Sequence, residues 1–391
     1  MSMNKKSIIS IVATMLLCVA SVASADTIKV GMSTALSGPA EALGQSMKAG
    51  VEASFAEINA TGGVNGHTLS LVALDDGYEP ARCAPNMRKL IDEENVFAVI
   101  GNVGTPTAIV AVPIANEKKT LLFGSFTGAG VLRNTPPDRY VINYRASYAE
   151  ETAAMVNGII DDLGVKPEEI AFFTQNDGYG DAGYKGAIKA LKDRGYQSAE
   201  NLAHGRYTRN TVNVEDGLIT ILNAPVEPKV VIMVGAYKPC AKFIKLAKQE
   251  GLEAVFMNVS FVGSNALAKE LGNESDGVVV TQVVPHFNAD LPAVNSFQKA
   301  MKQYAPKADA GFVALEGYIA AKIFAEGLKK VSGAPSKEAH IDGLESSGTF
   351  DVGIGEKCSL GKQEHQASHK IWPTVIRSGQ FVPLNWVDLK G

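Results

Sequence analysis

Cysteine is scarce in this sequence, with 4 among 391 residues. One of them, Cys18, lies in an apolar stretch near the N-terminus. The other three are Cys83, Cys240 and Cys358. Three cysteines permit at most one disulfide, with three possible pairings. No C-x-x-C motif occurs, and no His/Cys cluster has the spacing of a zinc site, so we expect no structural zinc.

Histidine is also sparse, and only His365 and His369 stand close enough together to suggest a metal site. They are four residues apart, a spacing that would place both on one face of a helix. Their surroundings, 361-GKQEHQASHK-370, are rich in Gly, Gln and Ser and do not favour a helix. We therefore interpret this stretch as a solvated loop and expect no metal.

Catalytic and cofactor-binding motifs are missing as well. The sequence has no G-x-S-x-G nucleophile turn, no G-x-x-x-x-G-K-[ST] phosphate loop and no complete dinucleotide fingerprint. Adjacent carboxylates such as Asp75-Asp76 and Glu150-Glu151 point apart instead of pairing, and we expect Asp75 and Asp76 to cap the turn that follows them. The chain is therefore predicted not to be an enzyme and to need no cofactor.

Basic runs are absent, and after residue 25 so are long apolar runs. Residues 1–25 combine two lysines, an uncharged apolar stretch and the small-residue end Ala23-Ser24-Ala25, which together indicate a cleaved secretory signal peptide. Removing 25 of the 391 residues leaves 366, a length that suits two domains. The 37 basic residues less Lys5 and Lys6 leave 35 against 41 acidic residues, a net charge of −6 that argues against nucleic acid as a partner.

The rest of the chain alternates between strand-like and helix-like apolar spacing. Strands are predicted at 28–34, 69–74, 96–100, 121–123, 170–174, 230–237, 254–260, 277–284, 371–377 and 380–386. Helices are predicted at 41–59, 80–94, from 106 onward, 148–163, 179–194, 292–304 and 312–330. Repeated β-then-α units of this kind indicate an α/β fold with parallel sheets covered by helices on both faces.

The repeating unit starts again after Arg145, which predicts two similar Rossmann-like lobes. We expect the chain to cross between them near 143–146, near 284–289 and within 347–371. The lobe boundaries that follow are 26–144 plus 287–369 for the first lobe, and 145–286 plus 370–391 for the second. Ligands of parallel sheets sit at the carboxyl ends of strands, so the loops there should line a cleft that closes by a three-crossing hinge.

The stretch 99-VIGNVGTPTA-108 passes from a strand to a helix through two glycines. We predict Thr105 as the N-cap and Pro106 as the first helical residue, which leaves the amides of Thr107 and Ala108 without helical partners. Such a helix end favours an anion, and without a phosphate-loop sequence the expected anion is a carboxylate. The Thr105 hydroxyl then either caps the helix or binds the ligand. A well-capped helix without a ligand explains the turn equally well.

Further candidate contacts follow other predicted strands. The Gly-rich stretch 124-GSFTGAG-130 offers two hydroxyls and an aromatic wall, and two tyrosines stand at helix starts in the second lobe. These candidates are Ser125, Phe126, Thr127, Tyr179 and Tyr237. For each of these residues, the alternative to a ligand contact is a structural role in a turn, in the core or at the rim of the cleft.

Five stretches in a fixed order identify a family: "IKVGMSTALSGPAEALGQ", "INATGGVNGHTLSLVALDDGYEP", "VIGNVGT", "NDGYG" and "VGAYKP". Over its mature length the chain resembles the type I periplasmic solute-binding proteins of ABC importers, in the leucine/isoleucine/valine-binding group. The resemblance implies a two-lobed fold, a small-molecule ligand, and a membrane permease and ATPase as partners. It also implies that the loop of Thr105 and Thr107 grips a ligand carboxylate beside Phe126–Gly128, and that Tyr179 and Tyr237 join the ligand on closure.

Two positions depart from the family pattern. Where amino-acid binders of the family hold the ligand's ammonium with a glutamate, this sequence has Ser260, and an aromatic of the first loop is replaced by Leu43. Burying an ammonium without a carboxylate partner is costly. Either another acid takes the role, with Asp177, Glu150 and Glu316 as candidates, or the ligand has no ammonium. The second case suits a more apolar acid, an amide or an aromatic carboxylate.

Three further positions bear on this choice. Arg145 is a possible anion partner, but a hinge salt bridge with Glu150 or Glu151 is the favoured interpretation. We expect Glu316 to be a surface or hinge residue instead of a ligand contact. The disulfide of the family is expected to be absent, because Gly104 stands where the partner of Cys83 would be.

We therefore expect a monomeric, extracytoplasmic solute-binding protein of an ABC importer, exported to the periplasm. It would capture a small carboxylate-bearing ligand, such as an amino acid or a related organic acid or amide, by hinge closure. The alternatives are a ligand-sensing periplasmic protein that docks a receptor, and a binder of a more apolar or aromatic ligand without an ammonium group. A doubly wound enzyme would need a nucleophile–base pair or a cofactor fingerprint, and the sequence has neither.

Overall fold

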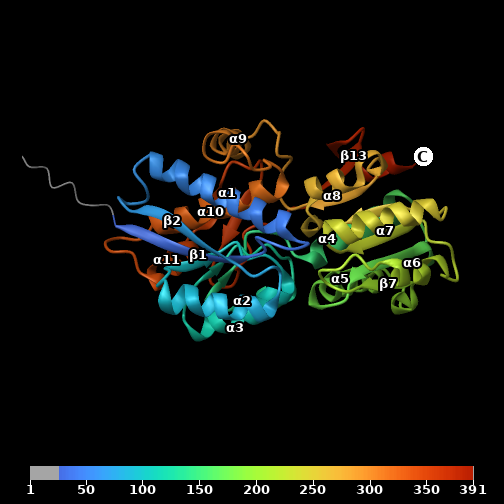
Figure 1. Ribbon diagram of the computed structural model, residues 1–391, viewed down its shortest axis with the longest axis horizontal. Coiled ribbons are helices and arrows are strands. Elements are labelled where there is room, and N and C mark those ends of the chain that lie inside the picture. Colours follow the sequence, from blue (N-terminus) through green and yellow to red (C-terminus); the bar gives the residue numbers. More distant parts are fainter. Residues whose placement is uncertain (1–25, 391) are drawn as a thin grey trace, which may run out of the picture.

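The computed structural model describes residues 26–390, so the predicted signal peptide and Cys18 lie outside the described residues. Two sheets with helices on both faces form two lobes that lie side by side (Figure 1). This arrangement confirms the predicted α/β class with two mainly parallel sheets. Among residues 26–390, none of the helices has both the length and the apolar character that a membrane crossing requires.

The first lobe is built on a parallel five-stranded sheet of order β2-β1-β3-β4-β5. Its strands are β1 Thr27–Thr34, β2 Thr68–Asp75, β3 Ala98–Ile100, β4 Leu122–Phe123 and β5 Val141–Ile142. Six helices cover it: α1 Glu41–Ala60, α2 Pro80–Arg88, α3 Thr105–Glu117, α9 Pro292–Tyr304, α10 Phe312–Lys329 and α11 Lys337–Glu345. Glycines bring α1 and α10 close together, because a Cβ at Gly50 or Gly317 would overlap the backbone of the other helix.

The second lobe is built on a seven-stranded sheet of order β14-β13-β10-β9-β8-β6-β7. Five strands are parallel: β6 Ile170–Gln175, β7 His204–Tyr207, β8 Val230–Val234, β9 Val255–Asn258 and β10 Val279–Gln282. The last two, β13 Trp372–Arg377 and β14 Gln380–Pro383, pair antiparallel at one edge. The helices are α4 Tyr148–Asn157, α5 Gly178–Asp193, α6 Glu215–Leu222, α7 Tyr237–Gln249 and α8 Ser264–Leu271.

Three linking segments join the lobes, between β5 and α4, between β10 and α9, and between the hairpin β11–β12 and β13. That hairpin consists of β11 Gly348–Asp351 and β12 Lys357–Leu360. Two of the segments run side by side, because Asn143 pairs in parallel with Gln366 and its amide donates to the His365 carbonyl at 2.7 Å. The predicted boundaries at 144/145, 286/287 and 369/370 fall in these segments and stay a prediction.

The stretch 361–370, predicted as a solvated loop, is partly buried in the third linking segment. His365 is buried, and its Nδ1 donates to the Val141 carbonyl at 2.8 Å, while Nε2 lies 3.2 Å from Glu345. His369 stays exposed and contacts Glu150 at 2.6 Å. The prediction was wrong for His365 because the segment crosses between the lobes, where backbone carbonyls of the first lobe need donors.

Candidate functional site

The turn before α3 lies at the carboxyl end of β3. The helix begins at Thr105, and Gly104 is its N-cap with φ +104°. The prediction that Thr105 caps the helix was therefore wrong, because glycine alone reaches this backbone conformation without strain. The amide of Ala108 was expected to be free but donates to the Gly104 carbonyl at 3.0 Å. The Thr105 hydroxyl does not cap the helix and lies 2.6 Å from the hydroxyl of Thr127.

The two threonines of this turn therefore differ in what their hydroxyls do. Thr107 is buried, and its hydroxyl donates to the carbonyls of Val103 at 2.5 Å and Gly104 at 2.9 Å. These bonds hold the turn together. Thr105 instead meets Thr127 from the neighbouring loop, so the hydroxyls of two strand ends converge on one place.

The loop after β4 supplies Ser125, Phe126 and Thr127, all of them buried. The amide of Phe126 donates to the Asn102 carbonyl at 2.8 Å, which ties this loop to the one after β3. The hydroxyl of Ser125 is buried and has no hydrogen-bond partner. The predicted first-lobe site residues of these two loops are thus brought together.

Aromatic side chains from both lobes close over these loops. The ring of Phe261, in the loop after β9, lies 5.2 Å from Phe126, 4.5 Å from Tyr179, 5.9 Å from Tyr78 and 6.4 Å from Tyr148, between centroids. All five side chains are buried. We call Tyr78, Phe126, Tyr148, Tyr179 and Phe261 the aromatic cluster.

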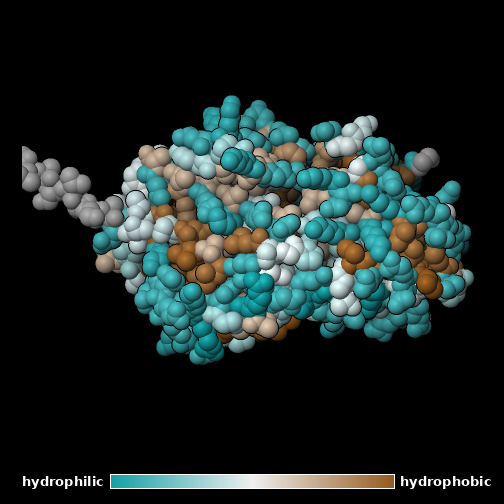
Figure 2. All heavy atoms as spheres, in the orientation of Figure 1, coloured by the Kyte–Doolittle hydropathy of each residue, from teal (hydrophilic) through white to brown (hydrophobic). Residues whose placement is uncertain are grey.

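The remaining predicted contacts, Leu43 and Tyr237, meet at a different edge of the cleft. Both lie next to Gly263, where a Cβ would overlap Leu43 and lie 3.8 Å from Tyr237. The cavity beside them has a volume of about 250 Å³ and is lined by α1, α8 and the start of α10. Figure 2 shows the hollow between the lobes on this face, within a mainly hydrophilic surface. A second cavity of about 580 Å³ opens beside Thr105, Arg133 and Gly178.

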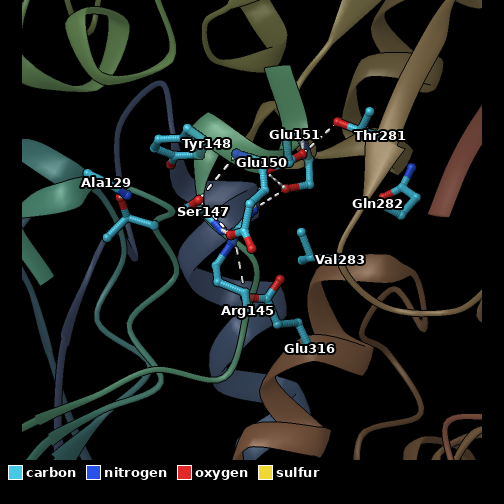
Figure 3. A network of polar contacts seen from close by, with 12 residues as sticks. Ala129, Arg145, Ser147, Tyr148, Glu150, Glu151, Thr281, Gln282, Val283 and Glu316 are labelled. Atoms are coloured by element: carbon cyan, nitrogen blue, oxygen red, sulfur yellow. Dashed lines mark hydrogen bonds and ion pairs between the residues drawn. The ribbon is translucent and has the colours of Figure 1, made fainter. Parts of the chain in front are cut away.

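Arg145, in the first linking segment, lies at the centre of a buried polar network (Figure 3). Its side chain is 1% exposed and forms ion pairs with Glu151 at 3.2 Å and Glu316 at 3.5 Å. It also donates to the hydroxyl of Ser260. Its guanidinium carbon lies 4.9 Å from the ring centroid of Phe126. The predicted hinge salt bridge with Glu151 is confirmed.

The carboxylates of the network are distributed between the lobes. Glu151, on α4, accepts from the Ser260 amide at 2.7 Å, the Ser260 hydroxyl at 2.9 Å and the Thr281 hydroxyl at 2.6 Å. Glu316, on α10, is buried and pairs with Arg145 of the first linking segment, so of the two expected positions, surface or hinge, the structure favours the hinge. Burial raises the pKa of Glu316 to about 7, although Arg145 opposes the rise.

The other two acids considered as ammonium partners are committed elsewhere. Glu150 closes a capping box with Ser147 at the start of α4, at 2.6 Å from its hydroxyl. Asp177 is the N-cap of α5 and pairs with Arg209 at 3.0 Å. Ser260 itself carries no charge and binds Glu151 and Arg145, so it belongs to the network.

A second set of polar contacts joins the lobes at the rim of the cleft. Arg209, in the loop after β7, pairs with Glu79 of the first lobe at 2.7 Å, and Asn210 donates to the same carboxylate at 2.6 Å. The side-chain amide of Gln175 donates to the hydroxyl of Tyr78 at 3.1 Å. The lobes are therefore in contact across the cleft, which corresponds to a closed arrangement.

Sequence reasoning missed Tyr78, Tyr148 and Phe261. Phe261 stands at the end of the strand predicted at 254–260, and loops after strands were expected to line the cleft, so a large apolar residue there was the available signal. Cys83, Cys240 and Cys358 are free and buried, so none of the three possible disulfides forms. In the described part of the chain, no group of three or more His, Cys, Asp or Glu side chains is placed to hold a metal ion.

Two α/β lobes with buried hydroxyls and aromatic rings at the carboxyl ends of their strands define the class: a non-enzymatic solute-binding protein of ABC transporters. The family follows from the sequence. The model described as "Periplasmic binding protein" matches residues 27–380, so the chain belongs to that family.

Relatives of known name support the same family. The chain is 26% identical to the "Leucine-, isoleucine-, valine-, threonine-, and alanine-binding protein" of Pseudomonas aeruginosa, over 86% of this chain and 88% of that one. It is 50% identical to the crystal structure of a possible leucine/isoleucine/valine-binding protein from Rhodopirellula baltica SH 1, with a TM-score of 0.91 over 94% and 98% of the two chains. A substrate-binding periplasmic protein from Ralstonia solanacearum is 27% identical, with a TM-score of 0.82 over 91% and 100%.

Proposed function

We propose that the protein captures a small carboxylate-bearing ligand in the cleft between its lobes and delivers it to the permease and ATPase of an ABC importer. Residues 1–25 would act as a signal peptide that directs the chain to the periplasm, where it works as a monomer. Closure of the lobes around the ligand would shift the open–closed equilibrium, and the permease would recognise the closed state.

The observation that carries the proposal is the meeting of hydroxyls at the start of α3. Thr105 and Thr127 lie 2.6 Å apart, and next to them the buried Ser125 hydroxyl has no partner. Helix N-termini favour negative groups, and hydroxyls supply donors of the right reach. A carboxylate placed here would accept from the Ser125 hydroxyl and from the one of the Thr105 and Thr127 hydroxyls that does not donate to the other. Thr107 would support the turn through its bonds to the backbone.

Apolar side chains from both lobes would complete the site. Phe126 of the first lobe and Tyr179 of the second would provide apolar contact area together with the rest of the aromatic cluster. Leu43 and Tyr237 would close the edge of the cleft at Gly263, and Ser260 would act through the network around Arg145. The hydroxyls of the first lobe would then recognise the carboxylate, and apolar side chains of both lobes would cover the ligand.

A matched pair of variants tests the carboxylate grip. Thr105→Val keeps the shape of the side chain but removes the hydroxyl, so we expect affinity to fall about tenfold, as for the loss of a hydrogen bond to a charged group. Thr120→Val is the control, because the Thr120 hydroxyl binds the Lys118 carbonyl and Lys337 at the amino end of β4, opposite the cleft. Calorimetric titration of purified protein with acids that raise its melting temperature gives the affinities.

Two results would contradict the proposal. Full affinity in Thr105→Val would exclude the carboxylate grip. Chemical conversion of any stabilising ligand by the protein would contradict a pure binding function.

A further inference from the structure

Three buried donor atoms at the first linking segment and the start of α4 lack a hydrogen-bond partner: Nε and Nη1 of Arg145 and the hydroxyl of Tyr148. The two side chains lie close together, because the guanidinium carbon of Arg145 lies 5.7 Å from the ring centroid of Tyr148 and 4.9 Å from that of Phe126. Buried donors are nearly always paired in folded proteins, so this group calls for an acceptor.

Most acceptors of the network are already in use. Both oxygens of Glu151 receive hydrogen bonds, from Arg145, Ser260 and Thr281. Glu316 forms an ion pair with Nη1 of Arg145 at 3.5 Å, without hydrogen-bond geometry. Glu316 therefore does not satisfy the donors of Arg145, so the missing group is an acceptor.

We propose that Arg145, with the Tyr148 hydroxyl, binds an acceptor group of the ligand, and that the ligand is an acid without an ammonium group. The inference rests on the proposed function and names the substrate class of the same cleft. Guanidinium groups hold carboxylates and carbonyl oxygens through directed donors, and the aromatic cluster provides cover for an apolar body.

An ammonium group would compete with Arg145 at this spot. Arg145 is itself a buried cation, and Nη2 of the partly buried Arg133 donates to its carbonyl at 2.9 Å. Glu316 is the carboxylate of the network that accepts no hydrogen bond, so a ligand ammonium would have to share it with Arg145. Like charges that are shielded from water repel strongly.

Sets of ligands with one carbon skeleton test the inference directly. Leucine, 4-methyl-2-oxopentanoate and 4-methylpentanoate form one set; phenylalanine, phenylpyruvate and 3-phenylpropionate form the other. Each is titrated against the full mature protein by calorimetry. We expect at least one ammonium-free acid to bind about tenfold or more tightly than the amino acid of its set. Tighter binding of the amino acid in both sets would overturn the inference.

Two variants that are expected to change the affinity in opposite directions accompany the titrations. Arg145→Gln should weaken binding of the acid about 10- to 100-fold, because it removes charged hydrogen bonds. Glu316→Gln should tighten it, because it removes a negative charge beside Arg145. Weaker acid binding in Glu316→Gln, or unchanged binding in Arg145→Gln, would overturn the inference. Thr120→Val serves again as the unaffected control.

The design separates this inference from the proposed function. If Arg145→Gln does not fold because it leaves two buried carboxylates unpaired, Glu316→Gln and the ligand sets still decide. Preferred binding of amino acids would overturn the inference and leave a carboxylate-binding protein. Failure of all six compounds to bind would count against both.

Discussion

The charge of Glu316 depends on its burial between the lobes. Its pKa is raised to about 7 in the folded protein, against an ordinary value of 4.5. Between these values the folded chain holds a proton that the unfolded chain releases. This contribution to stability is therefore fully present below about pH 4.5 and is lost as pH rises towards 7.

The first prediction concerns this pH window. Glu316→Gln has no proton to lose, so its free energy of unfolding should fall less than that of the wild type between pH 4.5 and 7, by at most about 3 kcal/mol. Urea unfolding of both proteins across this range measures the difference. Asp76, whose pKa burial raises to about 6, is present in both proteins and cancels. Parallel curves for the two proteins would contradict the prediction.

Individual residues of the candidate site were predicted from the sequence only where their position relative to a predicted strand was informative. Thr105, Ser125, Phe126 and Thr127 follow predicted strands, and such loops are where α/β sheets bind ligands. Phe261 also follows a predicted strand, but whether an aromatic in a loop faces the core or the cleft depends on how the lobes pack. The same holds for Glu316, whose burial results from the meeting of α10 with the first linking segment.

At the scale of elements, the start of α3 depends on Gly104. Its φ of +104° is unfavourable for a side chain, and a Cβ there would overlap the Tyr78 ring. We expect Gly104→Ala to lower the free energy of unfolding by about 2–4 kcal/mol, as strain adds to the overlap. Ligand affinity should fall as well, since Thr105 and Tyr78 would move.

Gly130 offers the matched control, because a Cβ there meets no atom within 4 Å and its φ is ordinary. Gly130→Ala should change stability by less than about 0.5 kcal/mol. Chemical unfolding of both variants gives the comparison. Equal effects of the two substitutions would show that the turn does not need glycine at position 104.

Helices and strands whose apolar residues recur with a clear period were predicted well. Elements with a weak period, or with few residues, were not. The bounds of α9 were predicted without error and those of α1 to within one residue. The four-residue strand β7, the helix α11 and the hairpin β11–β12 were missed. These pieces are short or exposed on one side, and neighbours distant in sequence decide their structure.

For the whole molecule, the bridge from Arg209 to Glu79 should bias the lobes towards closure. Arg209→Gln removes this contact, so the ligand-free protein should open more often and show a larger radius of gyration in solution scattering. Affinity should fall about two- to fivefold, because a partly exposed ion pair is worth up to about 1 kcal/mol. The fall should be the same for every ligand.

Arg206→Gln is the control for this change, since Arg206 pairs with Asp181 and the Gln175 carbonyl within the second lobe alone. It should leave the radius of gyration and the affinity unchanged. A fall in affinity that differs strongly between ligands would show that Arg209 contacts the ligand instead of acting on closure.

The order of the elements along the chain also sets the order in which the lobes can form. The first sheet has all its strands by residue 142, but α10, which packs on α1, comes from residues 312–329. The second sheet receives its edge strands only from residues 372–383. A chain that is synthesised from its N-terminus onward therefore cannot complete either core until most of its residues have been made. Such long-range dependence slows folding and keeps the nascent chain unfolded for longer, which is the state that the export we propose for this protein would require.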